Sequence, residues 1–237
     1  MDTIIQVLTL SGIFIAGLIV RALVAVLFLA AVVVPISAVL VAATWTRRGV
    51  DRLTGLQRIG EVLWRRGCYY TPGHLWVRAH GEQAVRIGVD DVARRVLPAI
   101  AQVALPAEGD ALARGAIIGR ITSAGGTVVL RSPVAGIVAA VNHRLFRTPS
   151  LLQRDPYRRA WLVEVRPSAR DYQALPIGDR AREWMAREDR RVTECFEHQL
   201  GLAAADGGAL TVPPHRLLTP AQWAAVRESV FGPGAEA

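Results

Sequence analysis

The pattern of hydrophobic and polar positions divides the chain into an apolar start and a longer part of mixed polarity. Residues 22–44 contain no charged side chain. At about 1.5 Å per residue, a helix of that length crosses a hydrocarbon core about 30 Å thick. We therefore expect a transmembrane helix over 22–44, inside a membrane anchor formed by residues 1–45, with Trp45 at the interface.

The residues beside this apolar segment indicate its orientation. The segment is followed by Arg47, Arg48, Arg52, Arg58, Arg65 and Arg66, whereas only Asp2 is charged before Arg21. The positive-inside rule then places the rest of the chain in the cytoplasm, attached to the inner membrane. Residues 3–20 are also apolar, and either a second short span or a continuation of the same helix fits them. A cleaved signal peptide is disfavoured, because no basic region precedes the apolar stretch.

Beyond the anchor, the periodicity changes twice. Leu53, Leu56, Ile59 and Leu63 recur every three or four residues, which predicts a helical juxtamembrane linker over 46–68. From Tyr69 onward, short strand-like runs such as 75–79 and 84–89 alternate with closely spaced turn residues. This pattern favours a small β-sandwich or barrel over residues 69–168, in which only 89–101 has a helical pattern.

The last part, residues 169–237, is predicted to be a helical extension. Residues 177–199 are rich in charge, with a thin apolar stripe formed by Trp184, Val192, Phe196 and Leu200. A second, short amphipathic helix is expected over 220–231, because Thr219, Pro220 and Gln222 form a capping box with proline at the first helical position. Its apolar face requires a cover, which either the domain itself or a partner protein provides.

The composition limits the kinds of partner and site that the chain is expected to have. The formal net charge is +8, and all 28 basic residues apart from histidine are arginines, so the sequence contains no lysine. The arginines are scattered or follow the apolar segment without interleaved aromatic residues, which argues against nucleic acid as a partner. Cys68 and Cys195 lie far apart, which predicts free thiols, and Cys68 with His74 lacks the second pair of ligands that a zinc site needs. We expect no metal site.

Residues 69–168 resemble the glycine cleavage H protein family. Five residues match the opening YTxxHxWV signature of that family, and later groups match its loop, its SPVxGxVxxVN run and its closing segment in the same order. The opening match comprises Tyr70, Thr71, His74, Trp76 and Val77, and the later run includes Ser132, Pro133, Val134, Gly136, Val138, Val141 and Asn142. The resemblance implies a mainly β, lipoyl-domain-like barrel-sandwich hybrid with flanking helices, here preceded by a transmembrane helix.

In that family, a lysine at a hairpin tip carries a lipoyl group. Aligned back from Ser132, the lysine position falls on Gly125, and the acidic residue that usually lies three positions earlier is replaced by Thr122. Lipoylation and biotinylation both require an amine on a long side chain, and the arginine guanidinium is no substitute nucleophile. The sequence therefore predicts an H-like domain without a bound cofactor.

Two sets of residues remain open to a second interpretation. The tip Ser123, Ala124, Gly125 and Gly126 either forms a plain hairpin turn or docks a partner protein. His74 and Trp76 either pack in the core or line the cleft in which the family holds its arm.

No constellation of catalytic residues is recognisable, so we expect a protein that is not an enzyme. The first hypothesis is a membrane-anchored, non-lipoylated, non-catalytic subunit that docks or assembles with a membrane complex or a lipoate-using enzyme. The alternative is an H-protein homologue with a regulatory or residual role in glycine cleavage.

Overall fold

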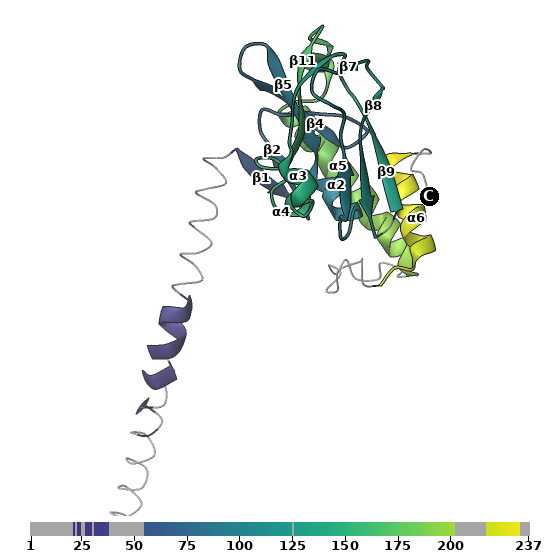
Figure 1. Cartoon of the computed structure of the whole chain (residues 1–237). Helices are drawn as coiled ribbons and strands as arrows, with labels where there is room; N and C mark the ends of the chain where they lie inside the picture. Colours follow the sequence, from purple (N-terminus) through teal and green to yellow (C-terminus); the bar gives the residue numbers. More distant parts are fainter. Residues whose placement is uncertain are drawn as a thin grey trace, which may run out of the picture. The chain divides into compact units, whose positions relative to one another are not determined.

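The structure is a computed structural model in which two compact units, residues 1–54 and 55–237, are distinguished. It describes residues 21, 23–24, 27–29, 31–37, 55–124, 126–201 and 217–232. In the first unit the described residues are helical (Figure 1), and their side chains are exposed. Over the described part of the chain, no helix has both the length and the apolar character needed to cross a bilayer. Residues 3–20, and about half of the span predicted at 22–44, lie outside the described residues.

The second unit is mainly β, as expected, and contains two sheets that share a core. The larger sheet has the strand order β3-β4-β5-β11-β10-β7, and the smaller has the order β6-β8-β9. The strands of the larger sheet are β3 (Tyr69–Tyr70), β4 (Leu75–His80), β5 (Ala84–Val89), β7 (Ala111–Leu112), β10 (Gly136–Val141) and β11 (Trp161–Pro167). Those of the smaller are β6 (Gln102–Ala104), β8 (Ile117–Ser123) and β9 (Gly126–Arg131).

Aliphatic side chains from both sheets meet in one cluster, which we call the sheet core. Ile87 and Val165 enter it from the larger sheet, and Ile121, Val128 and Leu130 from the smaller. All five side chains are almost completely buried. Two sheets that bury their inner faces against each other form a sandwich, so the predicted architecture is confirmed in these terms.

The structure corrects the prediction of a helical linker over 46–68. Residues 56–65 form an antiparallel hairpin of β1 (Leu56–Ile59) and β2 (Val62–Arg65), while 46–54 lie outside the described residues. Gly60 makes the turn with a positive φ, which suits a two-residue hairpin loop. Val62 and Trp64 are buried and alternate with half-buried neighbours, so the strand period of two decides this segment.

Helices cover the remaining apolar surface. They are α2 (Asp91–Val96), α3 (Arg144–Arg147), α4 (Leu151–Arg154), the 3-10 helix η1 (Asp171–Ala174), α5 (Asp179–Leu200) and α6 (Pro220–Phe231). The helices predicted over 177–199 and 220–231 are confirmed, and so is the reciprocal capping box between Thr219 and Gln222. The helical pattern over 89–101 yields only the short helix α2, which begins at its N-cap Asp90.

A second cluster, which we call the helix core, lies among β2, α2, α5 and α6. It is rich in aromatic residues, including Trp64, Tyr70, Trp76, Tyr157, Phe196 and Trp223. The rings of Phe196 in α5 and Trp223 in α6 meet edge to face, with their centroids 5.6 Å apart. The C-terminal extension is therefore covered by the domain itself, which was one of the two alternatives for its apolar face.

Candidate functional site

The predicted docking tip lies at the turn between β8 and β9. Ser123 pairs with Gly126 across the hairpin, and the Ser123 hydroxyl donates a hydrogen bond to the Gly126 carbonyl at 3.3 Å. Just behind them, the hydroxyl oxygens of Thr122 and Thr127 are 3.1 Å apart. Ala124 is exposed but Ser123 is buried, and Gly125, the position of the family lysine, lies outside the described residues. The described part of the tip is thus a tight turn with little free side-chain surface.

Helix α6 lies against this tip, beside β9 (Figure 1). A Cβ atom added at Gly126 would collide with the guanidinium of Arg227, which is itself buried at 7% exposure. Gly126 also has φ +109°, a backbone conformation that side chains with a Cβ rarely adopt. Glycine at this position therefore allows both the turn and the close approach of α6.

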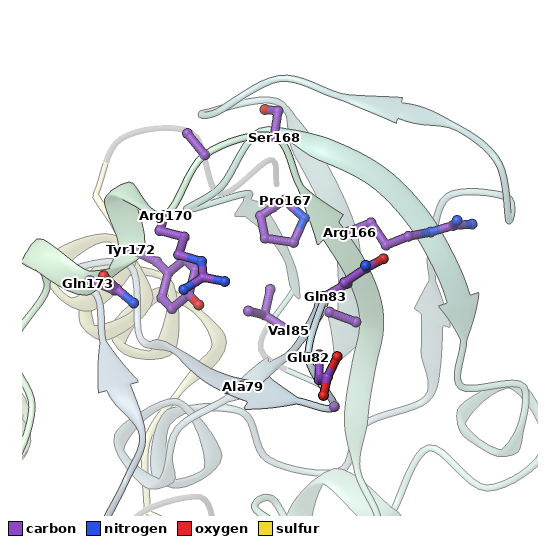
Figure 2. A pocket seen from close by; sticks show the side chains of 13 residues that line it. Ala79, Glu82, Gln83, Val85, Arg166, Pro167, Ser168, Arg170, Tyr172 and Gln173 are labelled. Atoms are coloured by element: carbon purple, nitrogen blue, oxygen red, sulfur yellow. The ribbon is translucent and has the colours of Figure 1, made fainter.

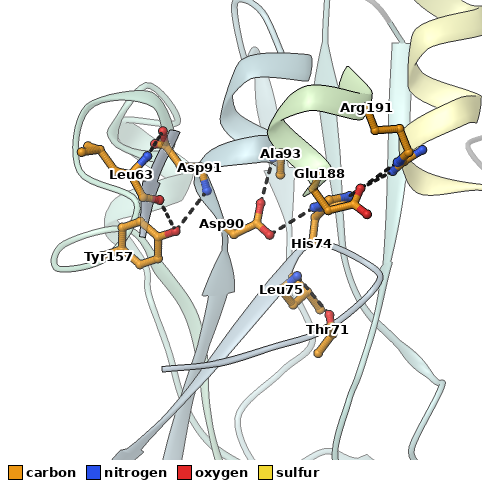
Figure 3. A network of polar contacts seen from close by, with 10 residues as sticks. All are labelled: Leu63, Thr71, His74, Leu75, Asp90, Asp91, Ala93, Tyr157, Glu188 and Arg191. Carbon is orange, nitrogen blue, oxygen red and sulfur yellow. Dashed lines mark hydrogen bonds and ion pairs between the residues drawn. The ribbon is translucent and has the colours of Figure 1, made fainter. Parts of the chain in front are cut away.

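His74 lies at the centre of a buried polar network (Figure 3). Its Nδ1 atom is 3.1 Å from Asp90 Oδ2, and the other oxygen of Asp90 accepts the Ala93 backbone N–H at 2.9 Å, which caps α2. The Nε2 atom lies 3.8 Å from Glu188 Oε2 and has no hydrogen-bond partner in the described part of the chain. Glu188 in turn is held by Arg191, whose Nη2 is 2.6 Å from the same carboxylate oxygen. The network therefore joins His74, which directly precedes β4, to Glu188 and Arg191 of α5.

Aromatic rings from the C-terminal extension seal His74 from solvent. The Trp184 ring of α5 lies 5.6 Å from the imidazole centroid, and the Phe231 ring at the end of α6 lies 5.8 Å away, edge to face. His74 itself is fully buried. Two residue sets that the sequence analysis treated separately, the tip and His74, are therefore both contacted by α6.

Trp76, the other residue considered for a cleft, is placed elsewhere. It belongs to the helix core, and its indole N–H donates to the Pro156 carbonyl at 3.1 Å. The ring lies on Gly88 of the neighbouring strand, where a Cβ atom would be only 2.5 Å from Trp76 Cζ2. Trp76 is 1% exposed, so it packs in the interior of the domain.

Tyr157 and Asp91 connect β2 to α2, a link that the sequence does not reveal. The Tyr157 hydroxyl donates to the Leu63 carbonyl at 2.7 Å, and the Leu63 N–H donates to Asp91 Oδ2 at 2.8 Å. Burial raises the pKa of Tyr157 well above its ordinary value. The paired hydrogen bonds explain why the hairpin of β1 and β2 belongs to the domain rather than to a separate linker.

Two of the surface hollows formed by the described residues border the elements discussed above. The larger, about 540 Å³, lies between the β4–β5 turn and the end of β11 (Figure 2). Arg170 reaches over it, Arg166 points away, and Tyr172 with Val85 forms its buried floor. The smaller, about 320 Å³, is bordered by Thr71, Gly73, Arg131 and Phe231 among others, so α6 forms part of its wall.

The described residues contain no group of three or more histidine, cysteine or acidic side chains that could hold a metal ion. Both cysteines are free thiols. Burial raises the pKa of Cys68 to about 12, so this thiol is protonated at neutral pH and is a poor nucleophile.

The chain was compared with known proteins. The family model described as Glycine cleavage H-protein matches residues 68–187. A glycine cleavage system H protein of Mycobacterium bovis is 36% identical over 107 residues, which cover 45% of this chain and 80% of that protein. Its counterpart from Nitratidesulfovibrio vulgaris is 41% identical over 110 residues, 46% of this chain and 86% of that protein.

Among solved structures, the crystal structure of a glycine cleavage system H protein from Mycobacterium marinum aligns with 53% of this chain and 99% of its own. The sequence identity is 26% and the TM-score is 0.46. The family-model match ends at residue 187, inside α5, so α6 lies beyond it.

Proposed function

Because this chain belongs to the glycine cleavage H-protein family, we propose that it is a membrane-anchored, non-lipoylated member that acts as a non-catalytic docking or assembly subunit. The observation that carries the proposal is the absence of lysine from the sequence, with glycine at 125 between β8 and β9. A lipoyl arm is attached through a primary amine on a side chain, and arginine does not supply one at cellular pH.

The tip contacts support this reading. Where the family presents a carrier arm, the described residues of this chain present a buried serine, a glycine without a side chain and the covering helix α6. The polar network around His74 is likewise closed by Trp184 and Phe231. The domain thus keeps the H-like scaffold, while the surfaces with which a carrier works are occupied by its own C-terminal extension.

Attachment to the inner membrane, with the domain in the cytoplasm, is the second part of the proposal. It is supported by the uncharged run over 22–44 and by the arginines that follow it. Anchoring would concentrate the domain at the bilayer, where a membrane complex or a lipoate-using enzyme is the partner that we propose.

Isolation of the tagged full-length protein in mild detergent tests the docking role. We expect a partner to co-purify in a fixed ratio, identified by mass spectrometry. The test variant is Gly126→Val, which must displace Arg227 and therefore disturbs the tip. The matched control is Gly81→Val at an open hairpin turn, because both glycines have a positive φ. A monodisperse protein that repeatedly carries no stoichiometric companion would refute the docking role.

Family membership also favours a second candidate, a regulatory or residual role in glycine cleavage itself. It predicts that adding this protein changes the rate of glycine decarboxylation by purified glycine cleavage components. Equal rates with and without the protein, together with no detectable binding to those components, would exclude this candidate and leave the assembly role.

A further inference from the structure

The positive charge of the second unit is concentrated in two short segments. Residues 55–237 contain 24 arginines and 18 acidic residues. Segments 55–67 and 144–159 together hold eight of these arginines but only two acidic residues, Glu61 and Asp155. The remaining residues of the unit contain 16 arginines and 16 acidic residues, which balance. The whole net charge of the domain therefore originates in these two segments.

The fold brings the two segments together. Tyr157 donates from its hydroxyl to the Leu63 carbonyl at 2.7 Å, and Arg65 Nη1 donates to the Tyr157 carbonyl at 2.6 Å. The pKa of Arg65 is lowered by burial first and then by its neighbours Arg78 and Arg158, so three guanidinium groups lie within electrostatic range. β2 and the chain after α4 therefore lie side by side, which brings arginines of the two segments close together.

Exposed arginine side chains of these segments are available to a partner. We call the exposed arginines of the two segments the arginine face, defined by Arg58, Arg66, Arg144, Arg147, Arg154, Arg158 and Arg159. On α3, Phe146 is 47% exposed and stands between Arg144 and Arg147. Exposed aromatic rings beside arginines are found on surfaces that lie at the headgroup level of a bilayer.

The chain length limits where this surface can lie. The domain begins at Gly55, and ten residues, 45–54, separate it from the end of the uncharged run at Thr44. Ten residues span at most about 35 Å, so an anchored domain stays close to the bilayer. A cationic surface near anionic lipid is attracted to it, and a planar guanidinium holds phosphate oxygens in a bidentate geometry.

We propose that the arginine face docks on an anionic bilayer, with its guanidinium groups on lipid phosphates and Phe146 among the headgroups. Docking in this way orients the domain relative to the bilayer. The closeness of the domain to the bilayer depends on the membrane attachment proposed above, whereas the concentration of arginines in the two segments does not.

Hydrogen exchange of the full-length chain in lipid nanodiscs tests the proposal. Discs of phosphatidylcholine alone are compared with discs that also contain phosphatidylglycerol. We expect peptides covering 144–159 to exchange about twofold or more slowly in the anionic discs, and the protection to disappear at about 0.5 M salt, where surface charges are screened. Peptides of α5 are expected to exchange equally in both.

Two variants with the same charge change make the test specific. Replacing Arg154, Arg158 and Arg159 together by Gln is expected to abolish the lipid-dependent protection. Replacing Arg180, Arg182 and Arg187 by Gln, which removes three exposed arginines of α5, is expected to leave it intact. Circular dichroism checks that both variants are folded. Equal exchange in the two kinds of disc, or equal effects of the two variants, would overturn the proposal.

The membrane attachment and the docking of the arginine face can be refuted independently of each other. A chain that does not enter neutral discs refutes the attachment, and the arginine face is then tested by flotation with anionic vesicles, in which only the Arg154, Arg158, Arg159 variant should lose binding. Tight binding of duplex DNA that the same variant abolishes, without any lipid-dependent protection, would assign this face to nucleic acid and overturn the lipid proposal.

Discussion

The sheet core and the helix core of this domain are built differently, and only one of them lies wholly within the family match. The sheet core is mainly aliphatic and lies between the two paired sheets. The helix core is aromatic, and α6 reaches it from beyond residue 187, where the family match ends. We expect the H-like scaffold to carry most of the stability, and α6, which lies beyond the family match, to affect mainly what the scaffold exposes.

The largest effect is expected in the sheet core. Ile87→Ala removes a fully buried side chain between the sheets and should cost about 4 kcal/mol of global unfolding free energy, because the rigid strands cannot close the cavity. Denaturant unfolding measures it. Ile137→Ala in β10, where the side chain is 50% exposed, is the matched control and should cost little. Similar losses in both would contradict the assignment of stability to this core.

A local effect is expected where α6 meets the helix core. Trp223→Ala removes the ring that contacts Phe196 and should cost about 3 kcal/mol of local stability, so that amide hydrogens of 220–231 exchange roughly a hundredfold faster. The hairpin of β8 and β9 should become more accessible at the same time. Leu217→Ala, at a 46% exposed position before the helix, is the control. If the global midpoint fell as far as in Ile87→Ala, the two cores would be one cooperative unit.

Alkaline pH should weaken the helix core selectively. Burial raises the pKa of Cys68 from its ordinary 9.0 to about 12, so the folded state keeps a proton that the unfolded chain releases. This contribution to stability is complete below pH 9 and declines by about 1.4 kcal/mol per pH unit until about pH 12. Cys68→Ala should flatten the decline measured by denaturation between pH 9 and about 10, before the buried Tyr70 and Tyr157, whose pKa values are also raised by burial, add a decline of their own; Cys195→Ala is the control. A decline of the same slope in Cys68→Ala would refute the role of this thiol.

The smallest effect is expected at the start of α6. Thr219→Ala removes one half of the capping box and should cost about 1 kcal/mol, confined to that helix. Exchange within 220–231 should rise about fivefold to tenfold, without a change in the sheet core. Ser229→Ala, an exposed position in the same helix, should show no such rise. An equal response of the two variants would mean that the cap does not hold α6.

Much of this fold can be predicted from local sequence signals. The strands at 75–80 and 84–89 follow their short apolar runs between turn residues, and α5 and α6 follow their stripe and capping residues. The hairpin of β1 and β2 was missed because four-residue strands contain too few positions to show a period of two. Its conformation also depends on the turn at Gly60 and on the hydrogen bond from the Tyr157 hydroxyl to the Leu63 carbonyl, neither of which is a periodic signal.

The candidate site was less accessible to sequence reasoning. The order of motifs located the tip and His74, but not the fact that one helix touches both. That contact joins Gly126 to Arg227 and His74 to Phe231, across more than 100 residues of chain. Such pairs depend on tertiary packing, and a single sequence contains no local pattern from which they could be read.

The central claim, a domain of this family that carries no lipoyl group, is tested most directly by intact mass. The full-length protein should be produced together with an active lipoate-attaching enzyme and a genuine glycine cleavage H protein as the internal positive control. We expect the control to gain the mass of one lipoyl group and this chain to keep the mass of its unmodified sequence. A covalent lipoyl increment on this polypeptide, at whatever residue, would contradict the account.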